Sequence, residues 1–217
     1  MGIRKSLRKK LLKRGNKVPY LLMNDDEKYL HRVLSMIGPE DTVIDLGAHV
    51  GKISRKFAER AKTVYSFEPH PEIFRTLQDN TKEFPNITTF QKAVSDTSGT
   101  AKLFSDPSMT TRPTQGSTLS DGKSDVSYEN SYEVQLVHFS KFVQDLDCTV
   151  KLIKVDIEGM EYRIINDLID SNAISRVEAV YVEDHCGIIG GLEAQRDATL
   201  EKIKRLNLGH KFNFDWP

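Results

Sequence analysis

The sequence contains little of what marks secreted or membrane proteins. It has two cysteines, Cys148 and Cys186, which set no disulfide framework and favour a reducing, cytoplasmic compartment. It has no run of about 18 apolar residues, so no membrane span is predicted. No apolar segment follows the basic N-terminus, so no signal peptide is expected. With 38% hydrophobic and 29% charged residues, the composition instead predicts one globular domain with a sizeable core.

The chain has no net charge, yet its charges are unevenly distributed. Its first 17 residues contain eight Lys or Arg and no acid, whereas the remainder contains 23 basic and 31 acidic residues. We therefore expect a basic N-terminal arm, residues 1–23, and an acidic body, residues 24–217, that binds no nucleic acid specifically. Residues 3–14 place apolar positions on one helical face. Residues 3–17 therefore either contact an anionic membrane surface or RNA weakly, or remain a solvated arm.

The clearest local signal is a strand, a turn and a helix around Gly47. Residues 42–46 form an apolar, β-branched run that stops at Gly47, and apolar residues after Gly51 recur at helical spacing. Gly47 allows a turn where a Cβ would clash, and the helix that follows begins with free N–H groups and a partial positive charge. Such a turn can receive a carboxylate or a phosphate.

A second strand, residues 62–67, ends on Glu68 and is followed by Pro69. An acid at this position can accept hydrogen bonds from both hydroxyls of a ribose, so the two features together predict a nucleoside-cofactor site.

The glycine spacing selects the cofactor. Dinucleotide binding requires G-x-G-x-x-G, whereas Ala48 and His49 stand between Gly47 and Gly51 here. S-adenosylmethionine has no phosphate and fits D-x-G-x-x-x-G better, although the loop alone also suits any βαβ crossover. The residues that we expect to hold this cofactor are Asp45, Gly47, Ala48, His49, Gly51, Glu68, Pro69, Ser95, Asp96 and Asp156.

Ser95 and Asp96 follow a predicted third strand over residues 86–91. They either bond the amino edge of adenine or form an ordinary turn into residues 100–104.

The segment 105–133 is then expected to be a flexible insertion, because 19 of its 29 residues are Ser, Thr, Asp, Asn, Gly or Pro. We interpret it as a lid over the acceptor site, after which residues 134–139 return as an exposed strand.

Acidic residues follow two further predicted strands. Asp156 and Glu158 come after residues 151–155, and Glu183, Asp184 and His185 come after residues 175–182. Parallel strands present their carboxyl ends to one crevice, so we expect these side chains to face each other, with His185 as a base. Alternatively, Glu158 caps the next helix and pairs with Lys154.

Four segments resemble the FkbM-type S-adenosylmethionine-dependent methyltransferases: Val43–Gly51, Phe67–Pro71, Lys92–Asp96 and, most specifically, the K-x-D-x-E-G-x-E block within Ile153–Glu161. The resemblance covers about residues 40–185. It implies a class I methyltransferase fold: an α/β, Rossmann-like architecture with a central, mostly parallel sheet and helices on both faces. It also implies O-methylation, often of a sugar or another small-molecule hydroxyl.

At the positions that match the family's motifs, the resemblance implies that Asp45, Gly47 and Glu68 bind the cofactor. It also implies that Asp156 and Glu158 lie near the transferred methyl group. Within the insertion, the short segment 116–119 makes Ser117 and Thr118 candidate substrate contacts, alongside Glu183 and Asp184.

We expect an in-line displacement in which Asp156 or His185 takes the hydroxyl proton and Glu158 or Glu183 orients the acceptor. As a variation, Asp156, Glu183 and Asp184 hold a divalent ion that lowers the pKa of that hydroxyl, although no metal is assigned from the sequence. Two alternatives stay open. One is a nucleic-acid or protein methyltransferase, against which the chain lacks an N/D-P-P-Y/F block. The other is a catalytically silent cofactor-binding adaptor.

Overall fold

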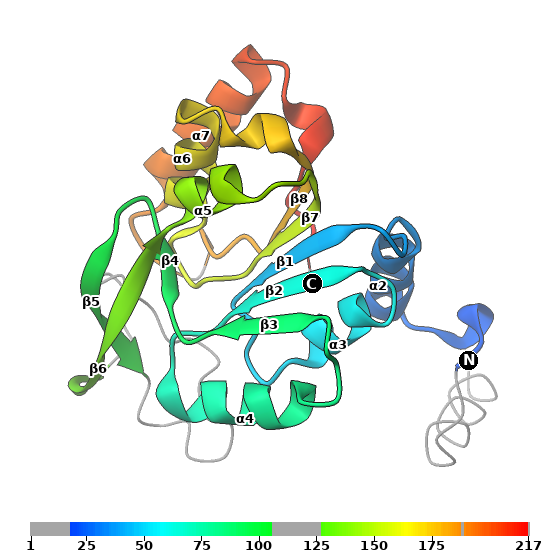
Figure 1. Ribbon diagram of the computed structural model, residues 1–217. Helices are drawn as coiled ribbons and strands as arrows, with labels where there is room; N and C mark the ends of the chain where they lie inside the picture. The colour runs from blue at the N-terminus through cyan, green and yellow to red at the C-terminus, as the bar shows by residue number, and fades with distance from the viewer. Residues whose placement is uncertain (1–17, 106–126, 188, 217) are drawn as a thin grey trace.

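The computed structural model describes residues 18–105, 127–187 and 189–216. Its main feature is a six-stranded sheet with strand order β3-β2-β1-β7-β8-β9, in which every neighbouring pair is parallel. The strands are β1 (Thr42–Leu46), β2 (Thr63–Phe67), β3 (Ile87–Phe90), β7 (Val150–Val155), β8 (Val177–Val182) and β9 (Phe212–Asn213). The predicted α/β fold with a parallel central sheet is confirmed (Figure 1).

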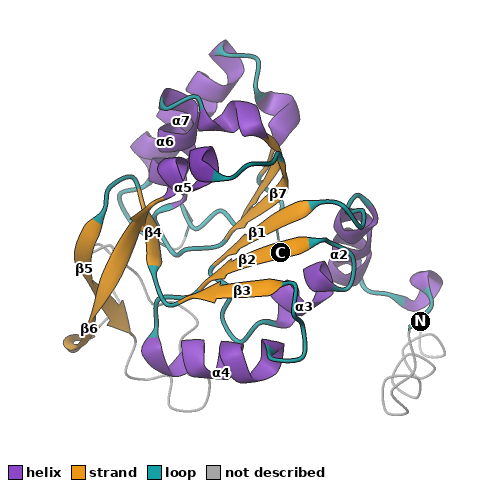
Figure 2. Cartoon of the chain, in the orientation of Figure 1, coloured by secondary structure: helices purple, strands orange, loops and turns teal. Residues whose placement is uncertain are grey.

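Helices cover both faces of this sheet because the buried strands are apolar on both sides. Ile44 and Leu46 of β1 belong to the larger apolar cluster, together with residues of α5 (Phe139–Asp145) and α6 (Glu161–Asp170). Val43, which precedes Ile44 and faces the other side of the sheet, belongs to a second cluster with α2 (Asp25–Ser35), α3 (Lys52–Ala58) and Trp216. Alternate residues of one strand therefore support two separate helix layers (Figure 2).

Local capping residues begin two of the helices. Asn24 and Glu27 form a reciprocal capping box at α2. Pro71 occupies the first turn of α4 (Pro71–Thr81), and α7 spans Glu193–Arg205. The shorter 3-10 segments are η1 (Tyr20–Leu22), η2 (Ala173–Arg176) and η3 (Gly209–Lys211). No helix of the described residues has the length and apolar character required to cross a membrane.

A second, three-stranded sheet was not predicted. Its strand order is β4-β6-β5, with β4 (Ala93–Ser95) parallel and β5 (Gly99–Ser105) antiparallel to β6 (Ser127–His138). This sheet stands beside the ends of β1, β2 and β3 in Figure 1. His70, which follows β2, contacts Tyr132 of β6, with 4.5 Å between the ring centroids. The second sheet therefore flanks the end of the main sheet at which the site residues lie.

The second sheet corrects one sequence-based boundary. Residues 127–133 were expected in the flexible insertion, but they form the first part of β6. Residues 106–126, which include Ser117 and Thr118, lie outside the described residues, as do residues 1–17 of the predicted basic arm.

Candidate active site

Gly47 brings the ends of β1 and β7 into contact. Its φ is +72°, and a Cβ at this position would lie 1.8 Å from the carbonyl oxygen of Asp156, so only glycine fits. The amides of Gly47 and Ala48 both donate to the carbonyl oxygen of Phe67 at 3.1 and 2.9 Å. The predicted turn therefore joins the carboxyl ends of three strands, β7, β1 and β2.

Gly51 closes the same loop at the beginning of α3. Its φ is +82°, and a Cβ would lie 2.8 Å from Cδ1 of Leu77 in α4. Gly47 is therefore required by a contact with backbone, whereas at Gly51 the left-handed φ is what favours glycine.

Glu68 lies at the end of β2, directly against the glycine loop. Its Oε2 accepts a hydrogen bond from the His49 amide at 3.0 Å, and its Oε1 accepts one from the His70 amide at 2.9 Å. The residue is only 6% exposed, and this burial raises the pKa of its carboxyl group to about 7 despite both amide bonds. Each carboxylate oxygen retains acceptor capacity beyond these bonds, which is the chemistry that a ribose diol requires.

Asp45, also expected to contact the cofactor, is fully buried. Its Oδ2 accepts a hydrogen bond from Ser54 at 2.6 Å, and its Oδ1 lies 3.2 Å from Nζ of Lys154. In this arrangement Asp45 has no surface with which to touch a ligand, so its part in the site is to hold Lys154.

Lys154 connects the glycine loop to the candidate catalytic residues. Its Nζ donates to the carbonyl oxygen of Gly47 at 2.7 Å and pairs with Oδ2 of Asp156 at 3.0 Å. Burial alone would lower the pKa of Lys154, but the charges of Asp45 and Asp156 outweigh it and raise this pKa above its ordinary value. Lys154 thus pairs with Asp45 and Asp156, and not with Glu158 as in the alternative interpretation of that residue.

Ser95 and Asp96 end β4 of the second sheet rather than a strand of the main sheet. Ser95 is buried and donates to Asp96 at 3.1 Å, and Asp96 accepts three hydrogen bonds from the Arg163 guanidinium at 2.6–3.1 Å. These bonds lower the pKa of Asp96 although burial opposes them. The side chains therefore connect the second sheet to α6, and a contact with adenine stays a prediction.

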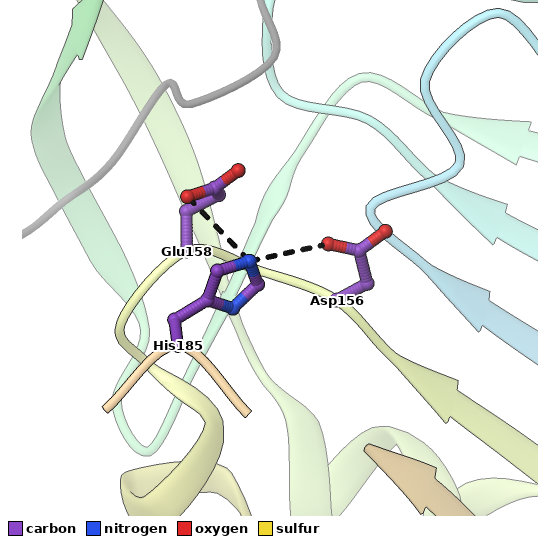
Figure 3. A group of neighbouring side chains, drawn as sticks. All are labelled: Asp156, Glu158 and His185. Atoms are coloured by element: carbon purple, nitrogen blue, oxygen red, sulfur yellow. Dashed lines mark ion pairs between the residues drawn. The ribbon is translucent and has the colours of Figure 1, made fainter. Parts of the chain in front are cut away.

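Asp156, Glu158 and His185 meet at the ends of β7 and β8 (Figure 3). Nε2 of His185 lies 3.6 Å from Glu158 Oε2, 3.7 Å from Glu183 Oε1 and 3.9 Å from Asp156 Oδ1. The positive φ of Glu158, +51°, accompanies the tight turn between β7 and α6. The predicted convergence of the two strand ends is therefore observed.

Glu161 holds His185 through the imidazole nitrogen that faces away from the cluster, Nδ1. Oε1 of Glu161 lies 2.9 Å from Nδ1 of His185, and both residues are buried. Burial favours the neutral imidazole, but the bond to Glu161 and the neighbouring charges outweigh it and raise the pKa of His185 to about 9. These interactions favour the protonated imidazole, which opposes proton uptake by His185, and its role as a general base stays a prediction.

Glu183 and Asp184 separate in space although they are adjacent in sequence. Glu183 faces the cluster, where burial and the carboxylate of Asp156 raise its pKa to about 7. Asp184 instead accepts hydrogen bonds from the Tyr162 hydroxyl and from Arg196 Nε. Burial would raise the pKa of Asp184, but these bonds lower it. Asp184 therefore anchors α6 and α7, and its expected contact with substrate or metal is not supported.

The sequence interpretation gave no role to Glu161 and considered Lys154 only as a partner of Glu158. Glu161 accepts hydrogen bonds from the Gly159 amide at 2.9–3.1 Å as well as binding His185. Both residues belong to the K-x-D-x-E-G-x-E block, so the family resemblance contained the signal that could have identified them.

Comparison with known proteins gives a consistent class of activity. The family model described as Methyltransferase FkbM domain matches residues 45–203. Hexuronic acid methyltransferase AglP of Haloferax volcanii is 23% identical over 168 residues, which cover 76% of this chain and 65% of that protein. Ribosomal RNA small subunit methyltransferase A of Clostridium botulinum is 39% identical over 69 residues, covering 31% of this chain and 25% of that protein.

The chain thus spans less than two thirds of the length of either relative. Among solved structures, an rRNA methylase from Streptococcus thermophilus superimposes with a TM-score of 0.46 at 9% identity, covering 84% of this chain and 80% of that one.

Proposed function

We propose that this chain, which belongs to the methyltransferase FkbM domain family, is a methyltransferase that uses S-adenosylmethionine as the methyl donor. The acceptor in this proposal is a hydroxyl group of a sugar, a glycan or another small molecule. The observation that carries this proposal is the group of carboxylates at the ends of β7 and β8, beside the glycine loop. Carboxylates accept protons and hydrogen bonds from hydroxyl groups, and they repel a nucleic-acid backbone. The similarity to a hexuronic acid methyltransferase adds support for a sugar acceptor.

In our proposal the cofactor binds beside the glycine loop and Glu68. Glu68 accepts the two ribose hydroxyls, and the loop from Gly47 to Gly51 bounds the methionine end, with Pro69 next to the ribose. When bound, S-adenosylmethionine supplies a methyl group that is already activated for transfer. The protein therefore has to align the acceptor and to remove its hydroxyl proton.

Glu183 is the best placed of the carboxylates to remove that proton. Its side chain is 35% exposed, whereas Oδ2 of Asp156 is occupied by Lys154 and the side chain of His185 is 4% exposed. In our proposal Glu183 takes the proton of the acceptor hydroxyl, and Asp156 and Glu158 orient the acceptor by accepting hydrogen bonds from its other hydroxyl groups.

Methyl transfer from labelled S-adenosylmethionine to a panel of acceptors tests the proposal. The panel contains hexuronic acids, neutral hexoses, oligosaccharides, simple alcohols and ribosomal RNA. We expect label in an ether of a sugar or an alcohol, lost in Glu183→Gln and retained in the control Asp197→Asn, whose carboxylate is exposed on α7. Label in RNA alone would favour the ribosomal RNA relatives instead. Cofactor binding without transfer to any acceptor would favour a silent adaptor.

A further inference from the structure

Four side chains at the ends of β7 and β8 are arranged around one small space. Nε2 of His185 faces carboxylate oxygens of Glu158, Glu183 and Asp156, and the stick view shows the first and last of these pointing toward the imidazole (Figure 3). One ligand atom from each of Asp156, Glu158 and His185 lies within 4.8 Å of the others. This spacing brings one imidazole nitrogen and several carboxylate oxygens together around one point.

The separations are too long for hydrogen bonds and suit a shared ion. Nε2 lies 3.6–3.9 Å from the three carboxylates, beyond hydrogen-bond distance, and bonds to no other atom within the described part of the chain. Two ligand atoms held about 2.1–2.4 Å from one metal ion, at about 90–110° to each other, lie about 3.0–3.9 Å apart. The three distances from Nε2 fall at the upper end of that range, and the ligand oxygens of Asp156 and Glu158 lie within 4.8 Å of each other.

His185 is held in the orientation that a metal ligand requires. The residue is 3% exposed, and its Nδ1 donates to Glu161, which can only accept because it is a carboxylate. Glu161 is itself fixed by two hydrogen bonds from the Gly159 amide. Metal-bound histidines usually donate their second nitrogen to a carboxylate in this way, which leaves Nε2 directed at the ion.

We propose that Asp156, Glu158 and His185 bind one divalent metal ion of the Mn²⁺ or Zn²⁺ type. Oδ2 of Asp156 is occupied by Lys154, so Oδ1, the oxygen that faces His185, is the ligand atom. The ion takes the place of any proton on Nε2, and that proton leaves to solvent. Mixed carboxylate and imidazole ligands suit these ions better than Mg²⁺, which prefers oxygen alone.

The role of the ion in catalysis rests on the function proposed above. Three protein ligands leave positions open for water or for oxygens of the acceptor. An acceptor hydroxyl on the ion would lose its proton more readily, and Glu183 is the adjacent carboxylate that would receive it.

Direct titration of the metal tests the site without relying on methyl transfer. The purified full chain is treated with EDTA, exchanged into metal-free buffer at about pH 8, and titrated with Mn²⁺ while electron paramagnetic resonance measures the free ion. We expect wild-type protein to bind about one Mn²⁺ per chain and Glu158→Gln to bind it at least about tenfold more weakly. The control Asp197→Asn, an exposed carboxylate on α7, should bind as wild type does.

A second variant tests the orienting bond. Glu161→Gln should weaken Mn²⁺ binding about 10–100-fold, because the amide holds the histidine less firmly than the carboxylate does. If Glu161→Gln does not fold, Glu158→Gln decides the question, since the Glu158 side chain is 20% exposed and is not part of the core.

Affinity for S-adenosylhomocysteine, measured by calorimetry in EDTA, separates the two proposals. Wild-type protein that binds this compound but takes up neither Mn²⁺ nor Zn²⁺ at up to about 1 mM overturns the metal site and leaves the proposed function standing. Protein that binds Mn²⁺ with the expected variant pattern but does not bind the compound supports the metal site and contradicts the proposed cofactor. Equal Mn²⁺ affinity in wild type and Glu158→Gln also overturns the site.

Discussion

Nζ of Lys154 lies 3.2 Å from Oδ1 of Asp45, and both side chains are buried between β1 and β7. This ion pair joins the strand that leads into the glycine loop to the strand that leads into the carboxylate cluster. The same ammonium group reaches the carbonyl oxygen of Gly47 and the carboxylate of Asp156. One buried cation therefore sets the relative position of the candidate cofactor and acceptor sites.

Lys154→Met should lower the free energy of unfolding by about 3–5 kcal/mol, because it leaves the buried carboxylate of Asp45 without a counter-charge. Urea unfolding followed by circular dichroism measures this change. Lys62→Met provides the comparison, because Lys62 forms an exposed pair with Glu40 and its loss should cause no measurable change. Equal stability of Lys154→Met and wild type would mean that the buried pair does not hold the loop.

Gly47→Ala should destabilise the protein by about 3 kcal/mol or more, since the added Cβ meets the Asp156 carbonyl at 1.8 Å in a left-handed conformation. Gly209→Ala is the matched control, because no atom lies within 4 Å of a Cβ at that position. Thermal unfolding of the two variants compares them directly. A Gly47→Ala protein as stable as Gly209→Ala would show that the strand ends can move apart at little cost.

Affinity for S-adenosylhomocysteine should weaken about tenfold from pH 8 to pH 6. The pKa of Glu68 is raised to about 7 by burial, so its carboxyl group is mostly ionised at pH 8 and mostly protonated at pH 6. Only the ionised form can accept both ribose hydroxyls. Calorimetry over this range measures the change, and Glu68→Gln should bind weakly with a flatter pH profile. Because Glu68→Gln retains His49 and His70, it shows how much of the pH dependence comes from these neighbours. If the pH dependence of affinity is the same in Glu68→Gln and wild type, Glu68 does not bind the ribose.

The carboxyl group of Glu68 should also make the free energy of unfolding depend on pH, but with the opposite sign: stability falls as the pH rises, whereas cofactor affinity increases. A carboxyl group whose pKa rises on folding stabilises the protein fully below its unfolded pKa of about 4.5, and this stabilisation is lost as the pH rises through about 7. In the absence of ligand, Glu68→Gln should therefore gain stability relative to wild type as the pH is raised from 5 to 8. Urea unfolding at several pH values measures the difference, and a constant difference would contradict the raised pKa.

Glu183→Gln should lower kcat by about 10²–10⁴-fold while affinity for S-adenosylhomocysteine stays near that of wild type, because only proton removal is affected. Asp184→Asn should behave in the opposite way. Its bonds to Tyr162 and Arg196 hold α6 and α7, so we expect a loss of about 1–3 kcal/mol in stability with kcat nearly unchanged. A loss of activity in Asp184→Asn without a loss of stability would indicate that Asp184 contacts the acceptor instead.

The sequence predicted the parts of the fold that depend on local signals. The strand before Gly47, the helix after Gly51 and the strand before Glu68 each have an apolar pattern that is set within a few residues and ends at a turn signal. Helix α5 was missed because its seven residues directly follow a strand and are too few for a clear helical period. The second sheet was missed because Ala93 pairs with Leu136, a partner distant in the chain.

The sequence by itself determined which strand ends form the candidate site, since the carboxyl ends of parallel strands must share one edge of the sheet. Only the tertiary structure decided what each side chain does there. Asp184 turns to Tyr162 while its neighbour Glu183 faces His185, and Asp45 is buried against Lys154 instead of facing a ligand. These side-chain orientations depend on backbone φ angles and on contacts with residues of other helices and strands. Neither the type of a residue nor its spacing in the sequence specifies those contacts.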